Sequence, residues 1–204
     1  MSGERPGPGE QLNAGEATPP RRSASLILLR DSSGGPEVLL VQRNPEQQFM
    51  GGAWVFPGGA AGEEDSDERA TAVRELEEEA GVRLEGDAEL ARYSRWITPA
   101  QVKRRFDTHF FVARSPDAAE VVVDRSECVD FRWIRPADAL TAGERDELLL
   151  VFPTIKHLEQ LAEHASVDDA MQDARSRRVL PVEPKVLTDG GVARVVLPGE
   201  SGYD

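Results

Sequence analysis

Three glutamates spaced for one face of a helix are the residues of this chain best suited to chemistry. Glu75, Glu78 and Glu79 stand at relative positions i, i+3 and i+4, and side chains with this spacing share a helix face. Crowded carboxylates repel one another, but a hard divalent cation such as Mg²⁺ binds oxygen ligands and removes that repulsion. Glu77 is expected to point elsewhere. The spacing therefore predicts a cation site on this helix.

The sequence before these glutamates suggests how such a site is built. Residues 54–56 form a short apolar strand that ends in Pro-Gly-Gly, a tight turn that can bring backbone carbonyls near the same cation. Arg74 stands inside the acid cluster, where its guanidinium can bind a carboxylate through two hydrogen bonds. A solvated acidic face is the alternative for a Glu-rich helix, but the turn and the arginine favour the cation site.

Capping signals delimit this helix. Asp65 lies three residues before Glu68, which is the spacing of a capping box at the start of a helix. Gly81 is a natural C-terminal cap, because glycine readily adopts the left-handed conformation required there. An apolar stripe at helical spacing is formed by Ala72, Val73, Leu76 and Ala80.

The stretch from Gly59 to Val82 resembles the Nudix box, G-x5-E-x7-R-E-U-x-E-E-x-G-U, where U is apolar. Residues 74–82, RELEEEAGV, match its second half at every defined position. The resemblance implies the Nudix fold, an α/β/α sandwich around a mixed sheet, and hydrolysis of a diphosphate linked to another moiety. It also implies Mg²⁺ or Mn²⁺ held by Glu75, Glu78 and Glu79 with the Gly59 carbonyl nearby, and an orienting role for Arg74.

The first half of the box departs from the family pattern by one extra residue. Counting forward from Gly59 places the box glutamate at Asp65, whereas counting back from Arg74 places it at Ser66. Glu64 is the nearest glutamate. The sequence leaves the identity of this loop acid open.

A carboxylate within reach of a water is needed to take its proton. Glu79 and Glu78 are the candidates on the helix. In some Nudix enzymes the base lies in a loop well beyond the box, and here Glu127 is preferred to Glu120. An ordinary surface acid is the alternative interpretation of Glu127.

Four residues are predicted to contact the substrate. Arg43 ends the second expected strand, and Phe56 and Gly58 belong to the turn before the helix. Arg105 is selected from the basic run 103–105 because a strand-like segment follows it. Lys103 and Arg104 are interpreted as residues of a solvated turn.

Features outside the box bear on the substrate. The segments 39–59, 104–114 and 197–203 resemble the Nudix subgroup related to peroxisomal-type coenzyme A diphosphatases, over roughly 23–204. This implies cleavage of coenzyme A or acyl-CoA to 3′,5′-ADP and (acyl-)phosphopantetheine. The usual L-R-x-H-x-G-E/Q run of coenzyme A enzymes is absent, and Met50-Gly51-Gly52 stands in its place. ADP-ribose, NADH, dinucleoside polyphosphates and oxidised nucleotides therefore remain alternative substrates.

Two alternatives do not involve catalysis. One is a Nudix-like module that binds a nucleotide without cleaving it. The other is an interaction protein whose acidic helix binds a basic partner. Neither requires all three helix acids beside a Gly-Gly turn, so both are less consistent with residues 56–82 than an enzyme is.

The composition restricts the class of protein. The chain has 204 residues and a net charge of −13, so it lacks the basic face that non-specific nucleic-acid binding needs. Apolar runs are too short to span a bilayer. The single cysteine, Cys128, excludes an internal disulfide and suits the cytoplasm. A small-molecule diphosphate is the expected partner, and the resemblance implies a homodimer.

The order of elements predicts an α+β fold. Residues 1–22, rich in Gly, Pro and Glu, are expected to be a disordered tail, and 23–204 to be the Nudix domain. A helical extension at about 144–177, interrupted near Pro153, and C-terminal strands around a Gly-Gly turn at 190–191 are expected. The other expected strands are 24–29, 38–43, 54–56, 90–96, 107–113 and 129–134, with helices near 65–80 and 136–140. This order suggests a mixed sheet covered on both faces.

Aromatic and histidine residues give weaker signals. Trp54, Trp96, Phe106 and Trp133 could stack on a nucleobase, but aromatic residues at strand positions are more often part of the core. The three histidines have no metal-binding spacing.

Overall fold

Strands and helices follow one another in the order expected for an α+β fold. The structure, a computed structural model, describes residues 16–117, 119–189 and 192–203. The strands are β1 Arg21–Ser32, β2 Gly35–Arg43, β3 Trp54–Val55, β4 Gly58–Ala60, β5 Ala91–Ile97, β6 Phe106–Arg114, β7 Cys128–Ile134, β8 Pro181–Val182, β9 Lys185–Asp189 and β10 Val192–Val196. The helices are α1 Glu68–Ala80, α2 Pro136–Glu144, α3 Phe152–Leu161 and α4 Val167–Ser176.

The start of the folded chain differs from the prediction. Residues 1–15 of the expected tail lie outside the described residues. Arg21 and Arg22, which were also assigned to the tail, belong to β1. The Thr18 hydroxyl donates a hydrogen bond to the Lys103 carbonyl at 2.7 Å. Part of the segment before residue 23 is therefore integrated into the domain.

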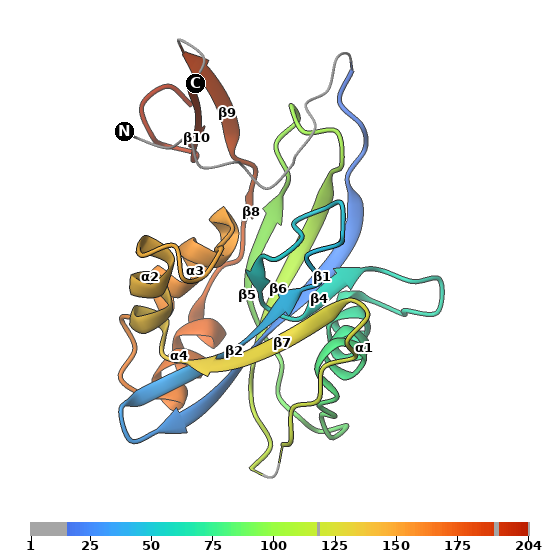
Figure 1. The fold of residues 1–204 in the computed structure, drawn as a ribbon, viewed down its shortest axis with the longest axis vertical. Helices are drawn as coiled ribbons and strands as arrows, with labels where there is room; N and C mark the ends of the chain where they lie inside the picture. Colours follow the sequence, from blue (N-terminus) through green and yellow to red (C-terminus); the bar gives the residue numbers. More distant parts are fainter. Residues whose placement is uncertain (1–15, 118, 190–191, 204) are drawn as a thin grey trace.

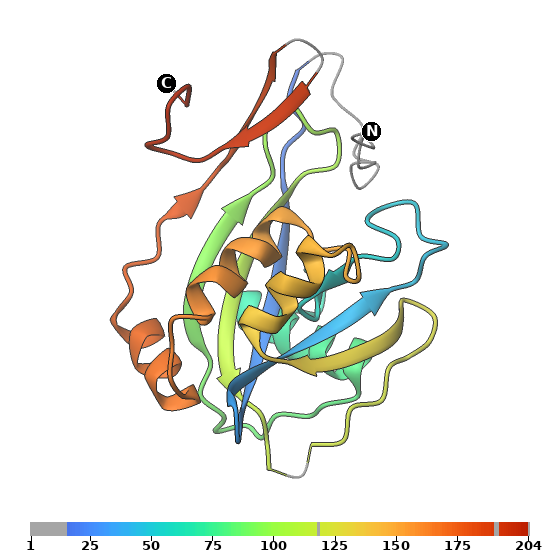
Figure 2. The same ribbon diagram turned by 60° about the vertical axis from the view of Figure 1, so that its left-hand side comes forward.

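A mixed sheet of eight strands forms the centre of the molecule. Its strand order is β3-β2-β1-β6-β5-β8, and β4 also pairs with β1 and β7 with β2. β1 and β2 form the expected antiparallel hairpin, whereas β1 and β6 run parallel. β9 and β10 form a separate hairpin near the end of the sheet where β1 begins (Figure 2).

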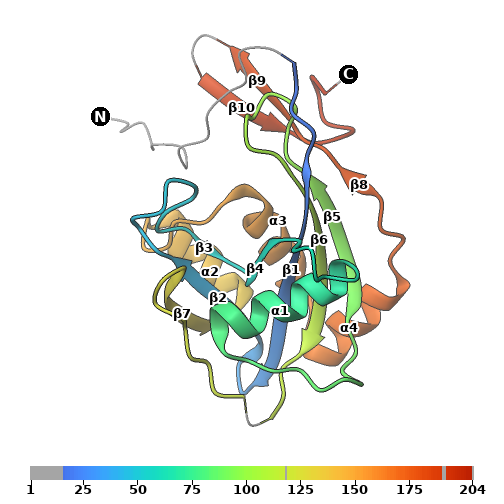
Figure 3. The same ribbon diagram turned by 90° about the vertical axis from the view of Figure 1, so that its right-hand side faces the viewer.

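Helices cover both faces of the sheet, which confirms the predicted three-layer arrangement. α1 packs on one face and α2, α3 and α4 lie on the other (Figures 1 and 3). Alternate residues of a strand point to opposite faces, so Leu26 and Leu28 of β1 enter the core beneath α1. Ile27 and Leu29 enter the core beneath the other helices. In the described part of the chain, no helix is long and apolar enough to cross a membrane.

The caps of α1 agree with the sequence at one end only. Gly81 ends the helix with φ 68°, as predicted. The N-terminal cap is Asp67, whose carboxylate accepts a hydrogen bond from the Ala70 N–H at 2.9 Å. The predicted cap, Asp65, is wrong because its carboxylate is engaged by Arg74.

The predicted helical extension consists of separate short helices. α2 ends at Glu144, and α3 begins only at Phe152, so the intervening residues are not α-helical. Pro153 lies in the first turn of α3. Backbone N–H groups in the first turn make no hydrogen bond within the helix, so proline costs no bond there. It therefore starts a helix and does not interrupt one. β8, β9 and β10 confirm the predicted C-terminal strands, while the Gly-Gly turn itself lies outside the described residues.

His157 of α3 is the most deeply buried histidine and belongs to the core. Its side chain is 1% exposed, its Nε2 lies 2.6 Å from the Ser94 Oγ, and its ring packs on Phe110 with a centroid distance of 4.3 Å. Burial lowers the pKa of His157 from 6.5 to about 3. The ring is therefore neutral in the folded protein at any pH near neutrality.

This burial predicts a loss of stability in mild acid. Below pH 6.5 the unfolded chain binds a proton at residue 157 that the folded chain excludes until about pH 3, so the free energy of unfolding falls as the pH falls. The wild type should lose about 2 kcal/mol more than His157→Gln between pH 7 and pH 5. Urea unfolding of both proteins at several pH values measures this difference.

Comparing the wild type with His157→Gln removes the contribution of other titratable groups to the pH dependence of stability. Burial raises the pKa of Glu79 to about 7, which increases the free energy of unfolding as the pH falls and so acts in the opposite sense. Because Glu79 is present in both proteins, its contribution cancels. Parallel pH profiles for wild type and His157→Gln would contradict the assignment of His157 as a buried neutral group.

Candidate functional site

The turn after β3 and the helix α1 bring two glutamates against two glycines. β4 pairs with the first part of β1, and this pairing places Gly58 and Gly59 over α1. The Gly58 N–H donates a hydrogen bond to Glu79 Oε2 at 2.8 Å. A Cβ atom on Gly58 would lie 2.5 Å from the Ala24 carbonyl oxygen, and one on Gly59 would lie 2.4 Å from Glu75 Oε1. The β1 backbone therefore excludes a side chain at Gly58, and a side chain at Gly59 would displace the Glu75 carboxylate.

Arg74 joins the acids to one another. Its guanidinium donates to both oxygens of Asp65 at 3.0 and 2.8 Å, to Glu75 Oε1 at 2.9 Å and to Glu78 Oε2 at 2.6 Å. The Ala60 carbonyl accepts a further bond at 3.1 Å. This bracing role of Arg74 is the one that the sequence predicted.

The same bonds identify the loop acid that the sequence left open. Asp65 is paired with both Nε and Nη2 of Arg74, and it also accepts a hydrogen bond from the Gly62 N–H at 2.8 Å. These bonds hold the pKa of Asp65 well below its usual range. Of the positions that counting allows, Asp65 is therefore the acid that contacts Arg74.

The buried acids carry negative charge that the protein neutralises only in part. Glu79 is 2% exposed, and burial raises its pKa to about 7. Burial also raises the pKa of Glu75, although Arg74 opposes this shift. Carboxylates removed from water are costly unless a positive charge compensates them. The cations of the protein therefore compensate the charge of these two carboxylates only in part.

The donor set fits a hard divalent cation, with one rearrangement. Glu75, Glu79 and the Gly59 backbone offer oxygen atoms, which Mg²⁺ and Mn²⁺ prefer. Within the described ranges, however, no three Asp, Glu, His or Cys side chains are gathered as a metal cluster. Glu78 is exposed, and its Oε2 pairs with Arg74. Its carboxylate has to turn toward Glu75 and Glu79 before all three glutamates can share a cation.

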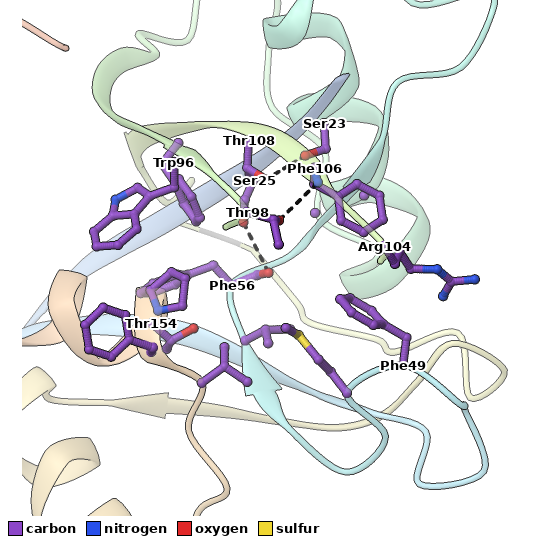
Figure 4. A pocket seen from close by; sticks show the side chains of 18 of the residues that line it. Ser23, Ser25, Phe49, Phe56, Trp96, Thr98, Arg104, Phe106, Thr108 and Thr154 are labelled. Carbon is purple, nitrogen blue, oxygen red and sulfur yellow. Dashed lines mark hydrogen bonds between the residues drawn. The ribbon is translucent and has the colours of Figure 1, made fainter. Parts of the chain in front are cut away.

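A cavity of about 680 Å³ has Glu75 in its lining, and Figure 4 shows side chains that surround it. Residues of β1, the loop before β3, β4, β5, β6, the start of α3 and the C-terminal hairpin line it. Its charged lining residues are Arg21, Arg43, Arg104, Glu75 and Glu127. Three cations beside two carboxylates contrast with the net charge of −13 of the whole chain, so the cavity suits an anionic ligand.

Most of the predicted substrate contacts reach this cavity. Arg43, Phe56 and Gly58 all line it. Arg43 Nη1 lies 4.0 Å from Glu79 Oε1. Its Nε is buried and has no hydrogen-bond partner among the described residues. A buried donor without an acceptor is rare in native proteins, and it favours an anionic ligand at this position.

Glu127 also lines the cavity, and its charge raises the pKa of Glu75, so the two carboxylates are near each other. Its backbone is fixed from both sides, because its N–H donates to Asp124 and its carbonyl accepts from Asn44, both at 2.8 Å. Glu120 is not among the lining residues. The preference for Glu127 over Glu120 agrees with this geometry.

Arg105 requires a correction. Its side chain is 8% exposed and turns away from the cavity. The guanidinium donates to the Thr98 and Thr18 carbonyls at 3.0 and 2.8 Å and forms a 2.6 Å ion pair with Glu183. It thereby ties the C-terminal segment to the sheet. The neighbouring Arg104, which was interpreted as part of a solvated turn, is the residue that faces the cavity.

Several aromatic lining residues were not found from the sequence. Trp54 and Trp133 lie outside the cavity, in keeping with a packing role, whereas Trp96 and Phe106 line it. The other aromatic lining residues are Phe49, Phe56, Phe110 and Phe152. Phe49 and Phe152 carry no motif, and only the tertiary structure brings them together.

Cys128 offers no alternative chemistry. The thiol is fully buried, and burial together with Glu79 raises its pKa. A thiol that stays protonated is a poor nucleophile. The acids and arginines remain the groups suited to catalysis.

Comparison with known proteins agrees with this geometry. A model of the NUDIX domain matches residues 19–152. The Caenorhabditis elegans protein named "Putative nudix hydrolase 7" is 28% identical over 227 residues, covering 93% of this chain and 77% of its own. Human acyl-coenzyme A diphosphatase NUDT19 is 31% identical over 122 residues, covering 56% of this chain and 32% of its own. The chain thus matches only about a third of the human relative.

A solved structure supports the fold. The crystal structure of a NUDIX hydrolase from Alicyclobacillus acidocaldarius has a TM-score of 0.68 and 27% sequence identity, and the match covers 76% of this chain and 96% of that one. The family model spans more than half of the chain and includes the turn, the acids and Arg74. The chain belongs to the Nudix family, and its enzyme class is that of a Nudix diphosphatase.

Proposed function

We propose that this chain hydrolyses a nucleoside diphosphate linked to another moiety, with Mg²⁺ or Mn²⁺ held by Glu75, Glu78, Glu79 and the Gly59 backbone. The observation that carries the proposal is the buried pair Glu75 and Glu79, whose negative charge is only partly compensated beside an arginine-lined cavity. A bound cation would supply the missing positive charge, neutralise the diphosphate and acidify a water bound to it.

The residues of the chain have separate roles in this proposal. Arg43, with its unpaired Nε, binds an oxygen of the substrate phosphates. Arg74 positions Glu75 and Glu78. Water attacks one phosphorus, the bridging P–O bond breaks, and a carboxylate accepts the proton of the water. Glu127 is the proposed proton acceptor, because it faces the cavity and its backbone is fixed by Asp124 and Asn44.

Coenzyme A or acyl-CoA is the proposed substrate class. The segments 39–59, 104–114 and 197–203 resemble coenzyme A diphosphatases, and the human relative is an acyl-coenzyme A diphosphatase. The cavity volume of about 680 Å³ lies within the range of volumes that is typical of small-molecule binding sites. ADP-ribose, NADH, dinucleoside polyphosphates and oxidised nucleotides are the competing substrates.

Loss of a buried acid should abolish turnover. Glu79→Gln keeps the size of the side chain but removes the charge that a cation needs, so kcat should fall on the order of 10²-fold or more. Glu77→Gln is the matched control, because Glu77 lies on the same helix and pairs with Arg83 away from the site; its kcat should change less than about twofold. Normal turnover by a folded Glu79→Gln protein would refute the site.

The proton acceptor can be tested separately. Glu127→Gln should lower kcat by about 10²-fold or more while KM changes little, because Glu127 acts on the water and does not bind the substrate. Glu120→Gln, outside the cavity, serves as the control and should behave as wild type. A Glu127→Gln enzyme with unchanged kcat would return this role to Glu78 or Glu79.

A substrate screen tests the chemistry and the specificity together. Coenzyme A, acyl-CoA, ADP-ribose, NADH and dinucleoside polyphosphates would each be incubated with the protein and Mg²⁺ or Mn²⁺, and the products identified by mass. We expect cleavage of coenzyme A or acyl-CoA to 3′,5′-ADP and (acyl-)phosphopantetheine with the highest kcat/KM. No cleavage of any of these compounds would favour a nucleotide-binding module without catalysis.

A further inference from the structure

Phe49, Phe106 and Arg104 lie together on one side of the cavity, opposite Trp96 and Thr154 (Figure 4). We propose that this cluster, the aromatic–arginine cluster, binds the nucleobase of the substrate. The inference deepens the proposed function and rests on it for the presence of a nucleotide. None of the three residues belongs to the Nudix box.

The geometry of the cluster suits a planar aromatic ligand. The Phe49 and Phe106 ring centroids are 5.8 Å apart and the rings are inclined by 48°, so they do not form a closed stack. Both side chains are only half-buried and both line the cavity. An exposed aromatic surface that lines a cavity can stack on any nucleobase, because every base has a π face.

Arg104 adds positive charge to this surface. Its guanidinium carbon lies 5.3 Å from the Phe49 ring centroid, a distance typical of cation–π contact. Within the described ranges no carboxylate forms an ion pair with Arg104, whereas Arg95, Arg105 and Arg114 each have at least one. A stacked guanidinium with no acidic partner among the described residues suits a nucleotide, which offers both a ring and an anionic group.

The loop that carries Phe49 has an unusual, tightly turned backbone. Met50 adopts a φ of 54°, which is uncommon for a residue other than glycine. A Cβ atom on Gly51 would lie 2.5 Å from the Gln47 carbonyl oxygen, and Asn44 Oδ1 accepts a hydrogen bond from the Glu46 N–H at 3.0 Å. Unusual backbone conformations persist where the surroundings enforce them and are concentrated at ligand sites. Here the loop holds Phe49 and Met50 at the cavity.

The opposite side of the cavity is less suited to a base. Trp96 packs edge-on against Phe152, with a centroid distance of 6.1 Å, and also against His157 at 5.8 Å. Trp96 is 8% exposed, so little of its ring face is available. The Lys156 ammonium lies 5.6 Å from the Phe152 ring centroid, but it pairs with Glu159 at 2.8 Å. This side therefore offers less free aromatic surface and less unpaired charge than the aromatic–arginine cluster.

Binding of two simple probes tests the proposal without turnover. Adenosine 5′-monophosphate and ribose 5-phosphate share the phosphate and the sugar, and only the first has a base. Titration calorimetry with Mg²⁺ should show that the wild type binds adenosine 5′-monophosphate about tenfold more tightly. Equal affinities would overturn the proposal.

Substitutions on the two sides of the cavity test where the nucleobase binds. Phe49→Leu should lower the affinity for adenosine 5′-monophosphate about tenfold, because the stacking surface is lost, and should leave ribose 5-phosphate within about twofold. Phe106→Leu is a second, independent variant with the same expectation. Phe152→Leu, on the opposite side, is the matched control and should preserve the preference for the base.

Arg104→Gln tests how much the guanidinium contributes to binding. It should weaken binding of adenosine 5′-monophosphate about threefold to fivefold, the size of an exposed cation–π contact. Lys103→Gln is the control, because Lys103 is adjacent and exposed but does not line the cavity, and it should change binding less than twofold. Equal effects of the two substitutions would show that Arg104 contributes only general charge and would remove it from the cluster.

The outcomes separate this proposal from the proposed function. Selective loss of the base preference in Phe49→Leu and Phe106→Leu supports the cluster even if no diphosphate is cleaved. Equal loss of both probes in these variants, or loss of the preference in Phe152→Leu, overturns it even if diphosphates are cleaved normally. Thermal unfolding of each variant confirms that the protein being titrated is folded.

Discussion

The burial of two carboxylates beneath a glycine turn is the constraint on which the rest of this molecule depends. Glu75 and Glu79 are 8% and 2% exposed, and removing such groups from water costs several kcal/mol each unless their charge is compensated. The Gly58 N–H, which donates to Glu79, and Arg74, which donates to Glu75, compensate this charge in part. A side chain at Gly59 would displace the Glu75 carboxylate, and one at Gly58 would collide with the backbone of β1. The remaining charge is left for a cation.

This arrangement explains how an acidic protein can act on an anion. With a net charge of −13, the chain repels phosphates at long range. The cavity reverses the sign locally through Arg21, Arg43 and Arg104. Elsewhere, arginines such as Arg95 and Arg114 are paired with carboxylates. The three lining arginines bring positive charge to the cavity, and bound cations would strengthen it.

Features set by local spacing were predictable from the sequence, and features set by tertiary contacts were not. The Gly81 cap and the two covered sheet faces follow from periodicity and conformational preference. Helical spacing also places Glu75 and Glu79 together in a buried position, whereas Glu78 is exposed. Asp65 was ambiguous by counting, and only its two bonds to Arg74 identify it as the loop acid. Arg104 and Arg105 are adjacent and chemically alike, so no pattern indicates which one contacts Glu183 and which one faces the cavity.

Chemistry and specificity consequently reside in different parts of the chain. The glycines, Arg74 and the acids proposed to hold the cation lie within one continuous stretch, residues 58–79, because a turn and a helix suffice to assemble them. The proposed proton acceptor, Glu127, comes from the loop before β7. The walls of the cavity come from segments that are far apart in the sequence, including Phe49, Phe152 and, in the C-terminal hairpin, Val195. Arg105 positions part of this wall through Glu183. Substitutions in the walls can therefore alter which diphosphate fits while the buried acids, and the reaction they support, stay unchanged.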